Sequence, residues 1–188
     1  MAATAPKITK ELLELARKRM KSSRLPALLG FYVESLAPGR AVLSMKVKER
    51  HRQIHNVVHG GVLAALADTA AAIAAYTVVP HGTEIATIEL KINYLSAVPG
   101  GKIKAEGRVL RAGRNFVVTE CEVFDGNGTL AAKALLTFGA AAGHSMERAA
   151  KPAKNRLLRA ALRGLFAVLV DVLDHTLENQ QVRTPLPR

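Results

Sequence analysis

The chain has 188 residues, of which 49% are hydrophobic and only 4% aromatic, and its formal net charge is +12 at pH 7. This length fits one domain with an appendage, whose core must consist mostly of aliphatic side chains. Its single cysteine, Cys121, excludes an internal disulfide, and the sequence has no zinc-ligand spacing. The positive charge favours an anionic partner, yet no nucleic-acid-binding motif or basic–aromatic pattern accompanies it.

The first predicted element is an amphipathic surface helix over residues 8–20. It mixes acidic and basic side chains and lacks a continuous apolar run, so no secretory signal is expected. The single cysteine fits a reducing compartment, so a cytoplasmic location is predicted. The mostly apolar stretch Leu28 to Leu36, which is followed by the turn Pro38-Gly39, is predicted as a first strand. Residues 41–48 alternate between apolar and polar side chains, which indicates a second, half-buried strand.

A polar loop over residues 49–56 leads into a long helix that Pro80 ends. The apolar run Val62 to Val79 approaches membrane-spanning length, but Asp68 near its middle, its many alanines and the strands that follow argue against a span. Four strands are then predicted, over residues 87–94, 102–109, 116–124 and 130–138. Because short turns join them, they are expected to form an antiparallel sheet.

The long helix is apolar nearly all round and must therefore be covered on most sides. The sequence thus predicts an α+β fold in which a curved antiparallel sheet wraps a long central helix. Small residues are expected to share the helix face that carries Asp68 and to permit close approach of the sheet or a partner: Gly61, Ala64, Ala65, Ala71, Ala72 and Ala75.

Three parts are predicted along the chain: an N-terminal amphipathic helix (1–24), the sheet-and-helix domain (25–139), and a linker with a C-terminal helical extension (140–188). Within the extension, Arg156 to Leu177 has the pattern of an additional amphipathic helix. This helix is expected to pack on its own domain or on a partner subunit. Binding to a membrane surface and a mobile extension are the alternatives.

The central helix opens with His59-Gly60-Gly61. Glycines at a helix start let another group approach the unpaired backbone N–H donors, which, together with the helix dipole, stabilise negative charge. The oxygen of a carbonyl under attack carries such a charge, so Gly60 and Gly61 are candidates for an oxyanion site. The alternative is that these glycines only permit tight packing.

Asp68 lies seven residues beyond Gly61, roughly 10.5 Å along the helix axis. It cannot easily reach an acyl group held at the start of its own helix, but it could reach one at the start of an antiparallel neighbouring helix. The spacing therefore indicates a site shared by two subunits. A lone acid on an apolar helix is costly unless paired, so the alternatives are a carboxylate with hydrogen-bonding neighbours or one exposed to solvent.

The segment Asn56-Val-Val-His-Gly-Gly61, followed by Leu66-Ala-Asp-Thr-Ala70, resembles the hotdog-fold acyl-CoA thioesterases of the phenylacetate-degradation (PaaI-like) type. The similarity extends from about the first helix to Phe138 and includes Ile92-Asn-Tyr-Leu-Ser96 and Val109-Leu-Arg-Ala-Gly-Arg114. The resemblance implies a hotdog fold, with two sheets paired in a homodimer and usually a tetramer. It also implies hydrolysis of an aromatic or medium- to long-chain acyl-CoA, with no metal and no cofactor other than the substrate's own coenzyme A.

The resemblance also implies residue roles. Asp68 would be the general base on water or the nucleophile, and the Gly60 N–H of the other subunit would polarise the thioester carbonyl. His59 and Gly61 would hold the geometry of the substrate loop, and Thr87 matches a hydroxyl that orients water in some relatives.

Two positions of the preceding loop depart from the family pattern. Gln53 stands where an asparagine that orients substrate or water is usual, and Asn56 stands where glycine is common, so Asn56 is a candidate to replace the missing asparagine. Arg111 and Arg114, which flank Gly113, would bind the phosphates of coenzyme A. These departures motivate a second hypothesis, a non-catalytic acyl-CoA-binding or regulatory protein. Charge alone motivates nucleic-acid binding, which is not expected, and neither is membrane contact.

Overall fold

The computed structural model describes residues 8–142. Its elements, in chain order, are α1 (Lys10–Ser22), α2 (Arg24–Leu29), β1 (Tyr32–Ala37), β2 (Arg40–Lys46), the short 3₁₀ helix η1 (Glu49–His51), α3 (Gly60–Tyr76), β3 (Thr83–Tyr94), β4 (Lys102–Ala112), β5 (Phe116–Phe124) and β6 (Leu130–Ala142). Most of the predicted linker and the whole C-terminal helix fall outside the described residues, so these two features stay predictions.

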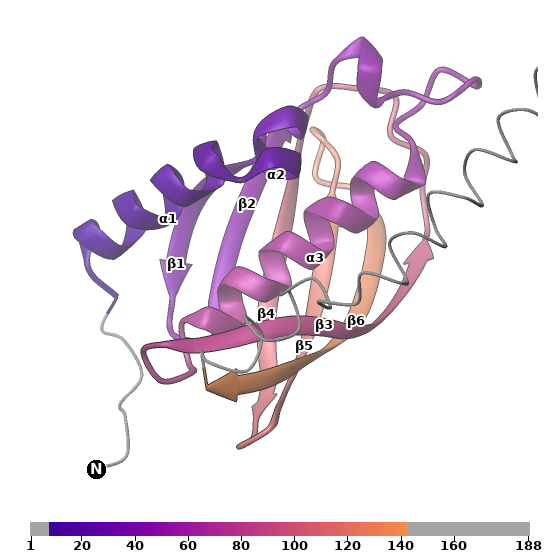
Figure 1. Ribbon diagram of the computed structural model, residues 1–188. Coiled ribbons are helices and arrows are strands. Elements are labelled where there is room, and N and C mark those ends of the chain that lie inside the picture. The colour runs from indigo at the N-terminus through magenta and orange to yellow at the C-terminus, as the bar shows by residue number, and fades with distance from the viewer. Residues whose placement is uncertain (1–7, 143–188) are drawn as a thin grey trace, which may run out of the picture. The chain divides into compact units, whose positions relative to one another are not determined.

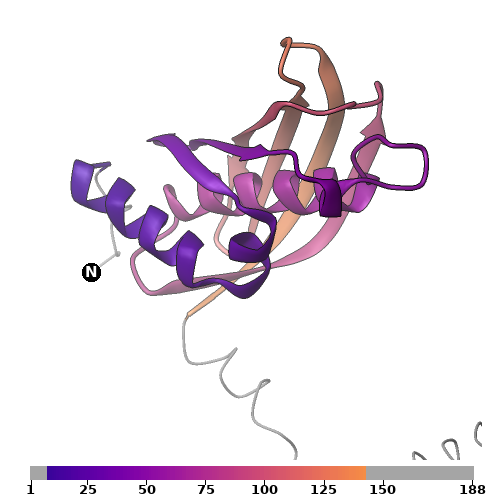
Figure 2. The same ribbon diagram turned by 90° about the horizontal axis from the view of Figure 1, so that it is seen from above.

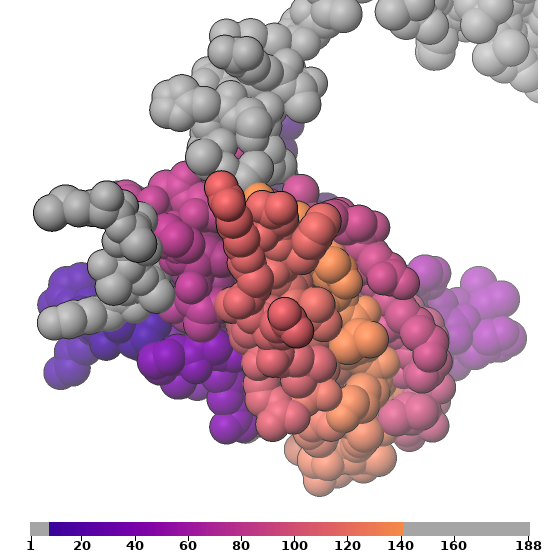
Figure 3. Space-filling model, turned by 90° about the horizontal axis from the view of Figure 1, so that it is seen from below, coloured from indigo at the N-terminus to yellow at the C-terminus, as the bar shows by residue number. Residues whose placement is uncertain are grey.

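The six strands form one antiparallel sheet in the order β1-β2-β4-β5-β6-β3. Helix α3 lies across the concave face of this sheet, while α1 and α2 lie beside β1 (Figure 1; Figure 2). Figure 3 views the molecule from below and shows the strands β4 to β6 forming a continuous surface. The predicted α+β fold, with a curved sheet wrapped around a long helix, is confirmed.

The stretch predicted as the first strand is divided between a helix and a strand. Its first two residues, Leu28 and Leu29, belong to α2, and β1 begins only at Tyr32. Pro26 lies in the first turn of α2, where a missing backbone N–H costs little, and Gly30 ends the helix in the left-handed region at φ 75°. The apolar composition of this stretch gave no sign of the break.

Three strands, β3, β4 and β6, are longer than predicted, and β-bulges interrupt the alternation in the first two. β3 begins at Thr83 and is irregular between Thr87 and Glu89, and β4 is irregular between Val109 and Arg111. A bulge adds one residue to a strand and reverses which face the following side chains point to. A strand predicted from alternating hydrophobicity therefore ends at the bulge, although the actual strand continues beyond it.

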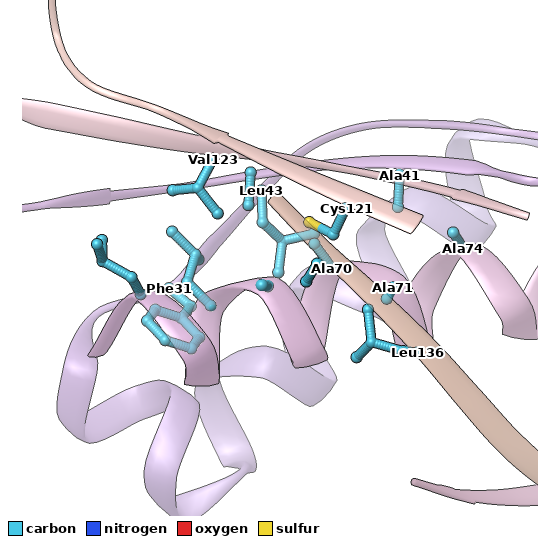
Figure 4. Packing of buried hydrophobic residues seen from close by; sticks show 14 of the residues in the cluster. Phe31, Ala41, Leu43, Ala70, Ala71, Ala74, Cys121, Val123 and Leu136 are labelled. Carbon is cyan, nitrogen blue, oxygen red and sulfur yellow. The ribbon is translucent and has the colours of Figure 1, made fainter. Parts of the chain in front are cut away.

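The core fills the space between α3 and the sheet (Figure 4). Ala70, Ala71 and Ala74 of α3 are fully buried, as are Leu43 of β2 and Cys121 of β5. Burial raises the pKa of the Cys121 thiol, so this cysteine is a core residue rather than a reactive one.

The backbone of β4 comes especially close to α3. A Cβ atom on Gly107 would lie only 2.5 Å from the carbonyl oxygen of Ala70. The small residues of α3 therefore serve close approach, as predicted, but they do not all share one environment: Ala71 and Ala75 are fully buried, whereas Ala64, Ala65 and Ala72 are half-buried, like Asp68.

The two edges of the sheet differ. Beside β1, the Arg17 guanidinium of α1 donates to the carbonyl oxygens of Val33 (3.0 Å) and Glu34 (3.3 Å) and lies 4.8 Å from the centre of the Tyr32 ring. At the opposite edge, β3 pairs only with β6 within residues 8–142. One sheet edge is thus covered, and the other presents unpaired backbone groups.

None of the helices in the described range has the length and apolar character needed to cross a bilayer.

Candidate active site

The start of α3 is held by the histidine that precedes it. His59 is the N-cap residue, and its Nδ1 accepts a hydrogen bond of 2.9 Å from the Gly61 N–H. The backbone N–H of His59 donates in turn to the carbonyl oxygen of His51 at 2.8 Å. A Cβ atom on Gly61 would lie 3.0 Å from His59 Nδ1, so a larger residue at this position would push against the capping imidazole. In this geometry the His59 side chain orients the backbone.

Gly60 leaves its own N–H available. As the first residue of α3 it has no partner within the helix, and its N–H finds none elsewhere among residues 8–142. On its other side, Gly60 faces the Tyr94 ring, whose Cζ would lie 3.0 Å from a Cβ atom added to Gly60. Both interpretations of the glycine pair therefore apply to Gly60, which permits close packing and also presents an unpaired donor at the positive end of the helix dipole.

Asp68 and Thr87 meet across the space between α3 and β3. The Thr87 hydroxyl donates to Asp68 Oδ1 at 2.8 Å. The Asp68 side chain is half-buried and Thr87 is exposed, so the carboxylate remains open to a small molecule on the side away from the core. The contact brings Thr87, which the resemblance implies as a hydroxyl that orients water, to the Asp68 carboxylate, a pairing that the sequence did not predict.

Asp68 and Gly60 do not meet within one chain. They lie eight residues apart on the same straight helix, which separates them by roughly 12 Å along its axis. A carbonyl oxygen bound at the Gly60 N–H is therefore beyond the reach of Asp68 of the same protomer.

The loop before α3 uses its polar groups internally. The Gln53 side-chain oxygen accepts from the His55 N–H at 3.1 Å, and the Arg52 guanidinium donates to the Asn56 carbonyl oxygen at 2.6 Å. Asn56 has φ 61°, a left-handed conformation that glycine and asparagine adopt most readily, which explains why asparagine can replace the usual glycine here. Gln53 is consequently turned toward its own loop.

Arg111 and Arg114 are exposed and lie far from the Gly60 end of α3. Their hairpin follows Val109, whose N–H donates to the Gly39 carbonyl oxygen, and Gly39 bonds Thr77 at the C-terminal end of α3. Neither arginine forms an ion pair with another residue of the described range. The structure therefore leaves both guanidinium groups available but does not bring them to the Gly60 of their own chain.

Two residues of this region were missed by sequence reasoning. His51 is fully buried, accepts a 3.0 Å hydrogen bond from the Lys48 N–H at its Nδ1, and anchors His59 through its carbonyl group. Tyr94 contacts Gly60. His51 lies in a polar loop and has no sequence signal of its own. Tyr94 belongs to the segment Ile92 to Ser96 that contributes to the family resemblance, but that resemblance implied no role for it.

The described residues contain no group of three or more histidine, cysteine or acidic side chains placed to hold a metal ion.

Comparison with known proteins places the chain in a family. The family model of the Thioesterase superfamily matches residues 55–132, which include all of α3. "Putative esterase SSO2140" of Saccharolobus solfataricus is 36% identical over 115 residues, which cover 61% of this chain and 81% of that protein. The 1,4-dihydroxy-2-naphthoyl-CoA hydrolase of Listeria monocytogenes is 28% identical over 97 residues, which cover 52% of this chain and 79% of that protein.

Among solved structures, zebra fish Thioesterase Superfamily Member 2 aligns with a TM-score of 0.64 and 27% identity, covering 71% of this chain and 99% of that one. The wrapped helix, the glycines at its start and the match over residues 55–132 are therefore explained together: the chain belongs to the thioesterase superfamily and has its hotdog fold.

Proposed function

We propose that the protein is an acyl-CoA thioesterase whose active site is shared by two copies of the chain. Asp68 of one protomer would act on a thioester carbonyl that the Gly60 N–H of its partner polarises. The observation that carries this proposal is the division of the site: Asp68 is paired with Thr87, the unpaired N–H is at Gly60, and both lie on one helix at a separation that one protomer cannot bridge.

A symmetric dimer would bring the two halves together. On α3 the order along the chain is Gly60 then Asp68, and on β3 it is Thr87, which bonds Asp68, then Tyr94, which bonds Gly60. A two-fold axis that passes between these pairs would therefore bring the Asp68–Thr87 pair of each chain to the Gly60–Tyr94 pair of the other. The unpaired edge of β3 supports this contact, because antiparallel pairing of two such edges would satisfy their backbone groups.

Two routes of hydrolysis fit a carboxylate in this position. As a general base, Asp68 takes a proton from water while the water oxygen attacks the carbonyl carbon, and collapse of the tetrahedral intermediate breaks the C–S bond and releases coenzyme A. As a nucleophile, Asp68 attacks the carbonyl carbon itself, coenzyme A leaves as its thiolate, and water cleaves the resulting anhydride. In both routes negative charge develops on the carbonyl oxygen, which the Gly60 N–H would stabilise.

Coenzyme A would account for part of the chain's net charge of +12. Its phosphates are suitable ligands for the exposed guanidinium groups of Arg111 and Arg114. The name of the Listeria relative, a naphthoyl-CoA hydrolase, supports an acyl-CoA as the class of thioester.

The proposal is tested by the release of free thiol from a panel of aromatic and medium- to long-chain acyl-CoA thioesters. Asp68→Asn should lower kcat by roughly 10²- to 10⁴-fold, because the amide neither accepts the proton nor attacks the carbonyl. Asp125→Asn is the matched control: Asp125 lies in the β5–β6 turn, where its side chain accepts backbone N–H bonds that asparagine can also accept. Equal rates for the wild type and Asp68→Asn would remove Asp68 from the chemistry.

One observation favours a second candidate function, the non-catalytic binding of acyl-CoA. The Gln53 side-chain oxygen is bonded within its own loop, which leaves only its amide N–H₂ to orient substrate or water. Tight acyl-CoA binding without turnover across the whole panel would identify this function in place of hydrolysis.

A further inference from the structure

Tyr94, the last residue of β3, contacts the first residue of α3, although 34 positions of sequence separate them. Its hydroxyl donates to the Gly60 carbonyl oxygen at 3.0 Å. Its ring lies against the Gly60 Cα, with three atoms between 3.0 and 3.3 Å from the place where a Cβ atom would be. The end of β3 thus both fills the space beside Gly60 and bonds its backbone.

The peptide unit between Gly60 and Gly61 is consequently held from both ends. Its carbonyl oxygen accepts from the Tyr94 hydroxyl, and its N–H donates to His59 Nδ1. The preceding peptide unit carries the unpaired Gly60 N–H, and its carbonyl oxygen, on His59, accepts from the Val62 N–H at 2.9 Å. The two units are joined at the Gly60 Cα, so fixing one restricts the direction of the N–H on the other.

Two successive glycines would otherwise make this helix start the least restrained part of the site, because glycine has the widest range of backbone conformations. A donor contributes most to a transition state when its direction is set before the reaction. From these contacts we propose that Tyr94 is a positioning residue, whose hydroxyl restricts the direction of the Gly60 N–H beyond what the Val62 hydrogen bond alone does. The inference rests on the proposed function in one respect: it takes that N–H to be the donor to the thioester carbonyl.

A packing role alone does not account for these contacts. Tyr94 is 51% exposed, and a phenylalanine would keep the buried part of its ring and cover Gly60 as well as a tyrosine does. The hydroxyl adds only the hydrogen bond to the Gly60 carbonyl oxygen. The variant Tyr94→Phe therefore removes this hydrogen bond and keeps the packing of the ring, so it separates the two roles.

Two measurements on Tyr94→Phe test the proposal: the hydrogen-exchange rate of the Gly61 amide, followed by NMR on glycine-labelled protein, and the kinetics of acyl-CoA hydrolysis. Loss of the hydrogen bond from the Tyr94 hydroxyl to the Gly60 carbonyl should raise the exchange rate of the Gly61 amide by roughly three- to tenfold. It should lower kcat by a similar factor, roughly three- to tenfold, and leave KM unchanged, because the donor acts in the transition state. Tyr32→Phe is the matched control, since Tyr32 is similarly exposed (41%) but lies at the opposite edge of the sheet, in β1.

The outcomes separate this inference from the proposed function. If the wild type hydrolyses no thioester, the proposed function fails, and Gly61 exchange alone decides whether Tyr94 positions the helix start. If the wild type is active, unchanged exchange in Tyr94→Phe overturns the inference, and so does faster exchange with unchanged kcat. A fall in kcat without faster exchange would assign the hydroxyl to the substrate and would also overturn it.

Discussion

The imidazole of His51 is buried beneath the loop that leads to α3, and the residue holds that loop twice. Its Nδ1 accepts from the Lys48 N–H at 3.0 Å, and its backbone carbonyl accepts from the His59 N–H at 2.8 Å. His59 in turn caps α3 through the Gly61 N–H. The direction of the backbone at the proposed active site therefore depends on a residue that would touch no substrate.

The protonation of His51 should set a limit on stability at mildly acidic pH. Burial, together with the positive charges of Arg50 and Lys48, lowers the pKa of His51 below its ordinary value of 6.5. The unfolded chain then binds this proton at a higher pH than the folded protein does. The contribution of neutral His51 to the free energy of unfolding is thus complete above pH 6.5. It is lost as the pH falls below that value toward the pKa of His51 in the folded protein.

We expect thermal unfolding, followed by circular dichroism, to shift to lower temperature between pH 7.5 and pH 5.5. His51→Gln should be less stable than the wild type at pH 7.5 and should depend less on pH in this interval. His81→Gln, which changes an exposed histidine in the turn after α3, should keep the wild-type pH dependence. If His51→Gln showed the same pH dependence as the wild type, His51 would not be the group that makes stability depend on pH in this interval. Carboxylates with a lowered pKa, such as Glu34, make the free energy of unfolding depend on pH only at lower pH values.

At the scale of elements, the contact of α3 with β4 determines how closely the sheet wraps the helix. Gly107 has no Cβ, and the facing residues of α3, Ala70 and Ala71, have small side chains, so two backbones come close together. This approach leaves no space for a further methyl group, because the contact atoms belong to the backbone and cannot rotate away. The position of α3, and with it that of Asp68, follows from this contact.

Gly107→Ala should therefore lower the free energy of unfolding by about 1–3 kcal/mol, as measured by urea denaturation. The added Cβ would lie 2.5 Å from the Ala70 carbonyl oxygen, so β4 or α3 must move. Gly126→Ala is the matched control, because its Cβ would make only ordinary contacts, the nearest at 3.5 Å. A destabilisation of the same size in both variants would mean that the close approach at Gly107 does not matter.

At the scale of the whole molecule, the proposed site exists only between two chains, and mixing inactive variants can test this. Gly60→Pro removes the N–H donor at a helix position that suits proline, and His59 already has the extended backbone that precedes proline. Gly60→Ala is its control: it keeps the N–H but adds the Cβ that contacts Tyr94. A larger loss of kcat in Gly60→Pro than in Gly60→Ala would measure the donor itself.

Chains with Asp68→Asn and chains with Gly60→Pro should each be nearly inactive alone. Coexpressed, they should recover about a quarter of the wild-type rate, because half of the random dimers are mixed and each mixed dimer contains one intact site of two. If Asp68 and Gly60 served one site within a single chain, mixing would restore nothing. A protein that sediments as a monomer at assay concentration would also contradict a shared site.

The sequence by itself determined the elements whose pattern is local and uninterrupted. The apolar helix that must be covered and strands such as residues 116–124 are present where their periodicity predicts them, because burial on one or all sides imposes that periodicity. The short helix α2 and the full lengths of β3 and β4 were not predictable in this way. A left-handed glycine ends α2 and bulges interrupt the alternation in the strands, and neither depends on hydrophobicity.

The parts of the candidate site divide in the same manner. Gly60, Gly61 and Asp68 stood out in the sequence because glycine pairs and a lone acid are anomalous in an apolar helix. The contacts of Thr87 with Asp68 and of Tyr94 with Gly60 join residues that are 19 and 34 positions apart. Such contacts arise only when β3 folds back along α3, so only the tertiary structure decided them.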